Sequence, residues 1–295
     1  MPLVSTGELV SSAAAGQRDG RGGVAAFNVI TLEHAEAIAA GAERAGRPAI
    51  LQISENAVKF HGGRLTALAA ATAAVARASD APLSLHLDHV ESAELMRAAD
   101  GEGFSSVMFD ASKLPYEENV AATAEAVAWG HARGIWIEAE LGKVGGKDGE
   151  PPLGAHTPGV RTDPAEAVAY VSATGVDALA VAVGSSHAMT DRTAALDHDL
   201  IGALRRAVAV PLVLHGSSGV PDDEIRRAVA AGMTKINVGT ALNTAFTATV
   251  RTHLAAAPKT VDPRKYLAPA REAMTGTVEA FLRVIGGEPR AVSDN

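Results

Sequence analysis

Three histidines and a carboxylate stand where apolar segments of this chain end. These segments are LSLHLDH (83–89), LAVAVGSSH (179–187) and PLVLHGSSG (211–219). A run of Val, Leu and Ala is typical of a strand buried on both faces. Imidazole and carboxylate groups at the ends of such strands lose hydration, which costs free energy unless they gain partners. A shared metal ion is the partner we expect for His89, His187 and His215.

Zinc is the metal that this ligand set favours. Neutral imidazole suits zinc, and three protein ligands leave a coordination position open for a substrate. The chain contains no cysteine, so thiolate ligands, disulfides and cysteine nucleophiles are excluded. Because strand side chains alternate, His86 shares a face with Asp88, whereas His89 points the other way or leaves the strand. We therefore predict that His86 is a hydrogen-bonded core residue. The remaining histidines are expected at the solvated surface: His34, His61, His131, His156, His198 and His253.

Three carboxylates accompany the histidines. Asp88 precedes a predicted ligand, and it could transfer a proton at a metal-bound substrate or orient a histidine. Asp110 and Glu140 end two further apolar segments. They could hold a second or transiently displaced cation, or form buried salt bridges, and the residues alone leave both alternatives open.

The elements that must position these groups alternate regularly along the chain. Strands are predicted at 24–29, 48–54, 82–89, 105–112, 135–142, 178–184, 211–218 and 235–240. Between them lie stretches of helical period such as 115–133 and 221–231, and Asp163-Pro164-Ala165-Glu166 predicts a helix start. Eight such units favour a (β/α)8 TIM barrel, a single domain over 1–295. The alternative, a doubly wound open sheet, is weakened because no Gly-x-Gly-x-x-Gly turn is present.

Two segments depart from the short connections of the barrel. A loop at about 142–162 contains six glycines and three prolines, which is typical of an active-site lid. An additional C-terminal helix is predicted at about 262–286, with an apolar stripe that we expect to pack on its own barrel.

Composition excludes several classes of partner. The 295 residues include 26 basic and 34 acidic ones, a net charge of −8 that disfavours nucleic acid. The N-terminus lacks the basic opening and apolar stretch of a signal peptide. Apolar runs are shorter than the ~18 residues of a membrane span. A soluble, cytoplasmic protein is expected.

The barrel prediction gathers polar groups at one rim, because active sites in this fold lie at the C-terminal ends of the strands. Asn28, Ser54 and Asn237 end strands there, beside the predicted metal ligands. Two turns follow the last two strands, and they predict a phosphate site: Gly216, Ser217 and Ser218, then Gly239 and Thr240. A Schiff-base mechanism would need a lysine inside the barrel. The strands supply only Lys235, which we expect on the face away from the site.

The motifs together resemble the class II fructose-bisphosphate and tagatose-bisphosphate aldolases over nearly the whole chain. They are MPLVS, AFN, LHLDH, SVMFDAS, ENV, EAELGKVGG, VPLVLHGSSGVP, KINV and DPRKYLAPAREA. The resemblance implies that His89, His187 and His215 bind catalytic zinc and that Asp88 is the proton donor and acceptor. It implies that Asp110 and Glu140 match positions that hold a second metal in some members, a divalent or monovalent cation. It also implies a dihydroxyacetone-phosphate pocket, formed by Gly216, Ser217, Ser218, Asn237, Val238, Gly239 and Thr240.

The activity implied is reversible cleavage of a ketose 1,6-bisphosphate to dihydroxyacetone phosphate and an aldehyde such as glyceraldehyde 3-phosphate. A lid carboxylate, Asp148 or Glu150, would transfer the proton at the enediolate carbon. A homo-oligomer, either a dimer or a tetramer, is expected.

The sequence departs from the family pattern at several positions. Ala188 stands where glycine is usual, Gly239 and Ala241 stand where polar or acidic residues are usual, and the lid sequence after Gly-Gly also differs. Alternatives are an aldolase for another phosphorylated ketose or keto-acid, a zinc hydrolase, and a non-catalytic sugar-phosphate-binding barrel.

Overall fold

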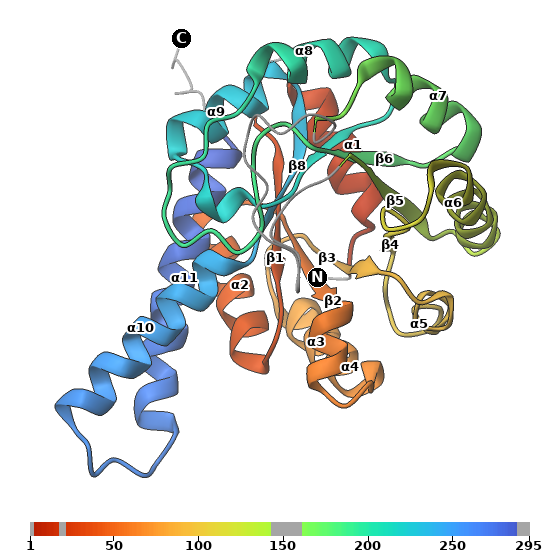
Figure 1. Cartoon of the computed structure of the whole chain (residues 1–295). Helices are drawn as coiled ribbons and strands as arrows, with labels where there is room; N and C mark the ends of the chain where they lie inside the picture. The colour runs from red at the N-terminus through yellow and green to blue at the C-terminus, as the bar shows by residue number, and fades with distance from the viewer. Residues whose placement is uncertain (1–2, 18–21, 143–160, 288–295) are drawn as a thin grey trace, which may run out of the picture.

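Eight parallel strands form a closed barrel in the computed structural model, which describes residues 3–17, 22–142 and 161–287 (Figure 1). The strands follow one another around the barrel in chain order, and the last pairs with the first. They are β1 (Val24–Asn28), β2 (Ala49–Ser54), β3 (Leu83–Val90), β4 (Ser106–Phe109), β5 (Trp136–Leu141), β6 (Ala178–Val181), β7 (Leu212–Leu214) and β8 (Met233–Val238). With helices between the strands, this is the predicted TIM barrel, which is therefore confirmed.

The helices surround the barrel and extend beyond it at the C-terminal end of the chain (Figure 1). They are α1 (Thr6–Gln17), α2 (Leu32–Ala45), α3 (Glu55–Phe60), α4 (Leu65–Ala78), α5 (Ala93–Ala98), α6 (Tyr116–His131), α7 (Pro164–Thr174), α8 (His198–Ala207), α9 (Asp222–Ala231), α10 (Thr240–Ala256) and α11 (Arg264–Ile285). The helix start at Asp163 is confirmed, since its side chain accepts hydrogen bonds from the backbone N–H groups of Ala165 and Glu166. The predicted loop at about 142–162 lies almost wholly outside the described residues.

Several predicted strand boundaries are wrong, and backbone conformation explains two of them. β7 ends at Leu214, because Gly216 adopts a left-handed φ of 68° and the next three residues form a 3-10 turn. β8 begins at Met233, two residues before the predicted start, directly after Gly232 caps α9 with a φ of 128°. β6 ends at Val181, so His187 lies in the following loop.

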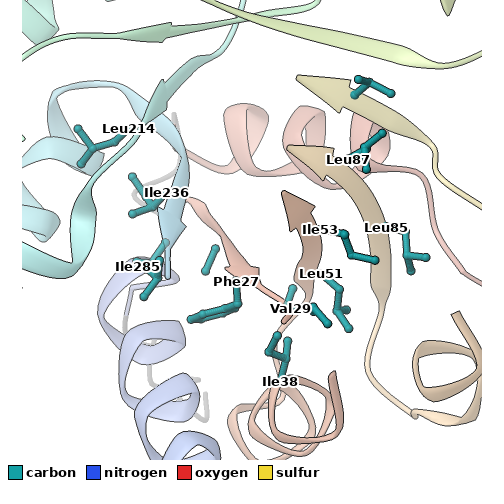
Figure 2. Close-up of a cluster of buried hydrophobic side chains, with 14 of the residues drawn as sticks. Phe27, Val29, Ile38, Leu51, Ile53, Leu85, Leu87, Leu214, Ile236 and Ile285 are labelled. Carbon is teal, nitrogen blue, oxygen red and sulfur yellow. The ribbon is translucent and has the colours of Figure 1, made fainter. Parts of the chain in front are cut away.

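Strand side chains divide between a shell beneath the helices and the barrel interior. Figure 2 shows Phe27, Leu51 and Leu85 among the apolar side chains packed on the outer side of the strands. Along β3 the residues alternate, so Leu83, Leu85 and Leu87 belong to this shell, while Ser84, His86 and Asp88 point inward. The barrel interior is therefore where this chain buries its polar groups.

Helix α1 closes one end of the barrel. Leu9 and Val10 pack against Val24, Ala26 and Ile50, which are inward-facing residues at the start of the strands. This leaves the opposite end, where the strands finish, for the functional site.

The C-terminal helix α11 packs on its own barrel, as predicted. Its buried stripe is Ala270, Met274, Val278, Phe281, Leu282 and Ile285. Gly41 of α2 allows a close approach, because a Cβ at this position would lie 2.6 Å from Cγ1 of Val278. Beyond this contact, α10 and the start of α11 project from the barrel as a two-helix arm (Figure 1).

Truncation after Pro269 is expected to unfold the protein. It removes six large buried apolar side chains of α11, which are Met274, Val278, Phe281, Leu282, Val284 and Ile285. Each is worth ~1.5–3 kcal/mol, so the total approaches the ~5–15 kcal/mol that stabilises a whole domain. Circular dichroism and sedimentation velocity check this. An intact fold with a changed mass would instead mean that the stripe is an interface between subunits.

No helix in the described part of the chain has the length and apolar character needed to cross a membrane.

Candidate active site

A cavity of about 620 Å³ opens at the C-terminal ends of the strands. Residues predicted for the site that line it are Asn28, Ser54, Asp88, His89, Asp110, His187, Gly216, Ser218, Asn237, Gly239 and Thr240. His215 and Glu140 are almost fully buried beside it. Ser217 and Val238, which were also predicted for the phosphate pocket, are buried and do not line the cavity. The hydroxyl of Ser217 donates a hydrogen bond to the carbonyl of Leu214. Asp148 and Glu150 lie outside the described residues.

An irregularity in β3 brings Asp88 and His89 to the same cavity. The register with β4 shifts between Leu87 and Val90, and His89 has a φ of 48°. Bulges of this kind re-aim side chains, and a non-glycine residue with positive φ is uncommon. Strict alternation predicts that His89 either points away from Asp88 or leaves the regular strand. The backbone turns at His89, so the second alternative holds.

Four side chains converge at a position that could hold a metal ion. His89, Glu140, His187 and His215 each offer one donor atom, and these four atoms lie within 4.8 Å of one another. The ring centroids of the three histidines are 4.7–5.7 Å apart. Three imidazoles and one carboxylate are a donor set that suits zinc. Glu140 therefore lies with the three histidines.

Asp110 lies behind His89. Its Oδ2 is 3.0 Å from Nδ1 of His89, and its Oδ1 accepts hydrogen bonds from the backbone N–H and the hydroxyl of Ser112. A carboxylate in this place fixes the ring orientation and leaves Nε2 of His89 to face the cluster.

His215 lies between two buried glutamates. Its Nε2 is 3.0 Å from Oε1 of Glu138, and its Nδ1 is 3.0 Å from Oε2 of Glu140. Burial lowers the pKa of His215, but the hydrogen bonds to Glu138 and Glu140 outweigh burial and raise the pKa to about 9. With Nε2 bonded to Glu138, Nδ1 and the facing Glu140 oxygen need a positive charge between them. A second ring proton supplies it when no metal is bound, which is why the pKa is raised, and a metal cation can take its place, so these residues fit a metal ion.

Asp88 is a buried carboxylate that stays ionised. Burial raises its pKa, but the charge of His89 and the contact with His86 hold the pKa well below its usual range. His86 Nε2 lies 3.7 Å from Asp88 Oδ1, and His86 Nδ1 bonds the hydroxyl of Ser106 at 2.7 Å. The prediction that His86 is a hydrogen-bonded core residue is confirmed.

The two turns predicted to bind phosphate meet at the start of α10. Ser218 Oγ accepts a hydrogen bond from the backbone N–H of Ala241, which joins the turn after β7 to this helix. A helix N-terminus presents unpaired N–H groups and a partial positive charge to an anion. A Cβ at Gly239 would lie 2.8 Å from Asn28 Oδ1, so a larger residue would displace Asn28. Ala188 adopts a left-handed φ of 57°, the conformation in which glycine is preferred.

Two sequence predictions are wrong for physical reasons. Lys235 does not face away from the site, because side chains two positions apart in a strand share a face and Asn237 lines the cavity. Lys235 therefore points into the barrel interior, fully buried, with Nζ 2.8 Å from Oε2 of Glu138. His34 is not solvated but 4% exposed, between Thr31 and Asn243, at 3.1 and 3.2 Å.

The sequence reasoning missed Glu138, although a signal was available. Glu138 precedes Glu140 by two positions in β5, so both point inward. Burial raises the pKa of Glu138, but the charge of Lys235 and the hydrogen bond from His215 lower it to about 2. Three further lining residues of the cavity were not predicted from the sequence either: Lys59, Lys113 and Asn243.

Comparison with known proteins places the chain in a family. A sequence model described as fructose-bisphosphate aldolase class-II matches residues 4–290. The chain is 39% identical to a fructose-bisphosphate aldolase of Geobacillus stearothermophilus, over 99% of both proteins. It is 36% identical to that of Staphylococcus aureus, over 99% of this chain and 100% of the relative. The crystal structure of the YdjI aldolase from Escherichia coli K12 is similar, with a TM-score of 0.82 and 30% identity over 98% of this chain and 99% of that one. The chain therefore belongs to the class II fructose-bisphosphate aldolase family, whose members are lyases.

Proposed function

We propose that this protein catalyses zinc-dependent, reversible aldol cleavage of a ketose 1,6-bisphosphate of the fructose or tagatose type. The products would be dihydroxyacetone phosphate and an aldehyde such as glyceraldehyde 3-phosphate. The observation that carries the proposal is the convergence of three groups of residues on one cavity. These are the four metal donors, the ionised carboxylate of Asp88, and the turns at the start of α10.

Zinc is proposed at the cluster of His89, His187 and His215, with Glu140 as a fourth donor. Bound there, it would supply Lewis-acid polarisation of the substrate carbonyl. Asp110 would orient His89 from behind, since its Oδ2 contacts Nδ1 of that ring. This role accounts for Asp110 without a second cation.

Asp88 is proposed as the base that takes the substrate hydroxyl proton during cleavage and returns it during condensation. It lines the cavity beside His89, and its lowered pKa keeps the carboxylate ionised at neutral pH. His86 is its buried neighbour, with Nε2 3.7 Å from Oδ1 of Asp88. Asp148 or Glu150 remains our proposal for the proton at the enediolate carbon.

The phosphate next to the ketone is proposed to bind Gly216, Ser218, Gly239 and Thr240 at the start of α10. These residues line the cavity and offer backbone N–H groups and hydroxyls. Asn28, Ser54 and Asn237 line the same cavity and are proposed to contact the sugar hydroxyls.

A panel of ketoses tests the substrate. We expect cleavage only where C1 carries phosphate, with fructose and tagatose bisphosphates cleaved best, because the proposed turns recognise the ketone half. A coupled assay for triose phosphate release measures it. Equal turnover of unphosphorylated fructose would contradict the phosphate site. Binding without cleavage of any member would favour a sugar-phosphate sensor, and phosphate release without carbon–carbon cleavage would favour a zinc hydrolase.

For assembly and location, we propose a cytoplasmic homo-oligomer that has no membrane or nucleic-acid partner. The projecting arm supports the assembly, because it exposes Leu254 and Val261, the latter 91% exposed. Apolar side chains on a projecting arm are typical of protein contacts. Sedimentation velocity of the full chain, in the same experiment as the truncation above, measures the oligomeric state.

A further inference from the structure

Three buried polar side chains, Lys235, Glu138 and His215, are bonded in series in the barrel interior, and His215 belongs to the metal cluster. Lys235 Nζ is 2.8 Å from Glu138 Oε2, and the other oxygen, Oε1, is 3.0 Å from Nε2 of His215. All three side chains are 0% exposed. Glu138 thus uses one oxygen for the lysine and the other for the histidine.

We infer that Glu138, held by Lys235, is a positioning residue that sets how tightly His215 binds metal. The inference rests on the metal site proposed above. It adds two residues that touch neither the metal nor the substrate and act through the ring of His215.

The ring geometry supports this role. Glu138 accepts a hydrogen bond from Nε2 of His215, so the proton of the neutral ring is held on Nε2. Nδ1 is then left as the lone-pair atom, and Nδ1 is the ring nitrogen next to Glu140, at 3.0 Å. A histidine ligand that donates its other N–H to a carboxylate is more basic and has a fixed orientation.

Lys235 makes it possible to bury this carboxylate. A buried ionised carboxylate with one neutral partner is costly, whereas a close opposite charge offsets much of that cost. β5 and β8 are not neighbours in the barrel, so the ion pair spans the interior. The alternative is that Lys235 and Glu138 serve only as an internal brace, in which case the bond to His215 has no influence on the metal.

Replacement of the ion pair as a unit separates these alternatives. We compare Glu138→Leu/Lys235→Met, which removes both charges and the acceptor, with Glu138→Gln/Lys235→Met, which keeps an oxygen acceptor for Nε2. Exchanging a buried ion pair for apolar residues of similar volume is often neutral for stability. The measurement is Zn²⁺ affinity by chelator competition without substrate, and the absorption spectrum of the Co²⁺-loaded protein reports coordination.

We expect the leucine variant to bind Zn²⁺ about 10–100-fold more weakly than the wild type, the usual effect of losing a partner of a metal-bound histidine. The glutamine variant should recover part of this loss. Thr72→Val is the control, because it removes a buried hydroxyl that donates to the carbonyl of Leu68 within α4, outside the cavity lining, and should leave Zn²⁺ affinity unchanged.

Wild-type Zn²⁺ affinity in both double variants would overturn the inference and leave Glu138 and Lys235 as a brace. If the leucine variant does not fold, the glutamine variant still decides, since a neutral amide is a weaker acceptor and should lower the affinity several-fold. Because no substrate is present, failure of the aldolase proposal is a separate result. It would appear as a wild-type protein that binds zinc tightly but cleaves no ketose bisphosphate.

Discussion

Replacing His89, His187 or His215 singly with alanine is expected to remove most of the bound zinc and nearly all aldolase activity. Each variant leaves two imidazoles and Glu140 around the site. The loss of affinity should exceed the ~10–100-fold associated with the residues behind the ligands. Metal content after dialysis, measured by atomic emission, and ketose bisphosphate cleavage in the same samples check this.

The three variants should differ in stability. His215 and Glu138 are fully buried and bonded to each other, so His215→Ala leaves a buried carboxylate with fewer partners. His89 and His187 are partly exposed, and their loss should cost less. His253→Ala, on the projecting arm, is the control and should keep zinc and activity. Undiminished zinc in all three variants would mean that the metal site is elsewhere. Full activity after exhaustive chelation would mean that the activity does not depend on a metal.

Asp88→Ala is expected to retain zinc but to lower kcat by roughly 10²–10⁴-fold, the usual contribution of a positioned acid–base group. Asp88 is not among the four clustered donors, so metal content should stay near one equivalent. Asp88→Asn keeps the shape and removes the basicity, and it should be similarly slow. Zinc content and kcat, determined on the same preparation, separate the two effects.

A matched control for Asp88 is Asp262→Ala, which removes an exposed carboxylate bonded to Arg264 near the tip of the arm. It should leave kcat unchanged. If zinc is lost together with activity in Asp88→Ala, Asp88 is a metal ligand or orients one. An unchanged kcat would mean that another residue transfers the proton, and Asp148 and Glu150 would be tested first.

Much of the barrel could be predicted from sequence because its signals are local. Eight apolar segments separated by stretches of helical period specify the βα repeat, and Asp163 with Pro164 shows where α7 begins. The direction of the chain also determines that groups at strand ends, such as Asp88 and His215, gather at one rim.

Strand boundaries were harder to predict, because hydrophobicity does not stop where hydrogen bonding stops. Most residues after β7 remain buried, including His215, Ser217 and Ser218, yet the strand ends at Leu214. The positive φ of Gly216 turns the chain, and a side chain there would collide with the backbone of Ser186, 2.5 Å from its carbonyl oxygen. That constraint comes from a neighbouring loop and is invisible in the local sequence.

Side-chain direction at the site was decided by tertiary structure. Alternation alone separates Asp88 from His89, but the shift of β3 against β4 and the φ of 48° at His89 bring both into one cavity. Pairing with another strand produces such a bulge, so its position depends on residues distant in the chain.

The residue types and their order along the chain thus determined a TIM barrel with three histidines at one rim, at or after the ends of strands, because periodicity and strand polarity are properties of the chain itself. Only the tertiary structure showed that Glu140 joins these histidines, that Asp110 lies behind His89, and that Lys235 and Glu138 meet across the interior. The contacts of Asp110 with His89 and of Lys235 with Glu138 join residues 21 and 97 positions apart in the chain. Barrel closure and strand register, which bring these side chains within hydrogen-bond distance, emerge only when all eight strands pair.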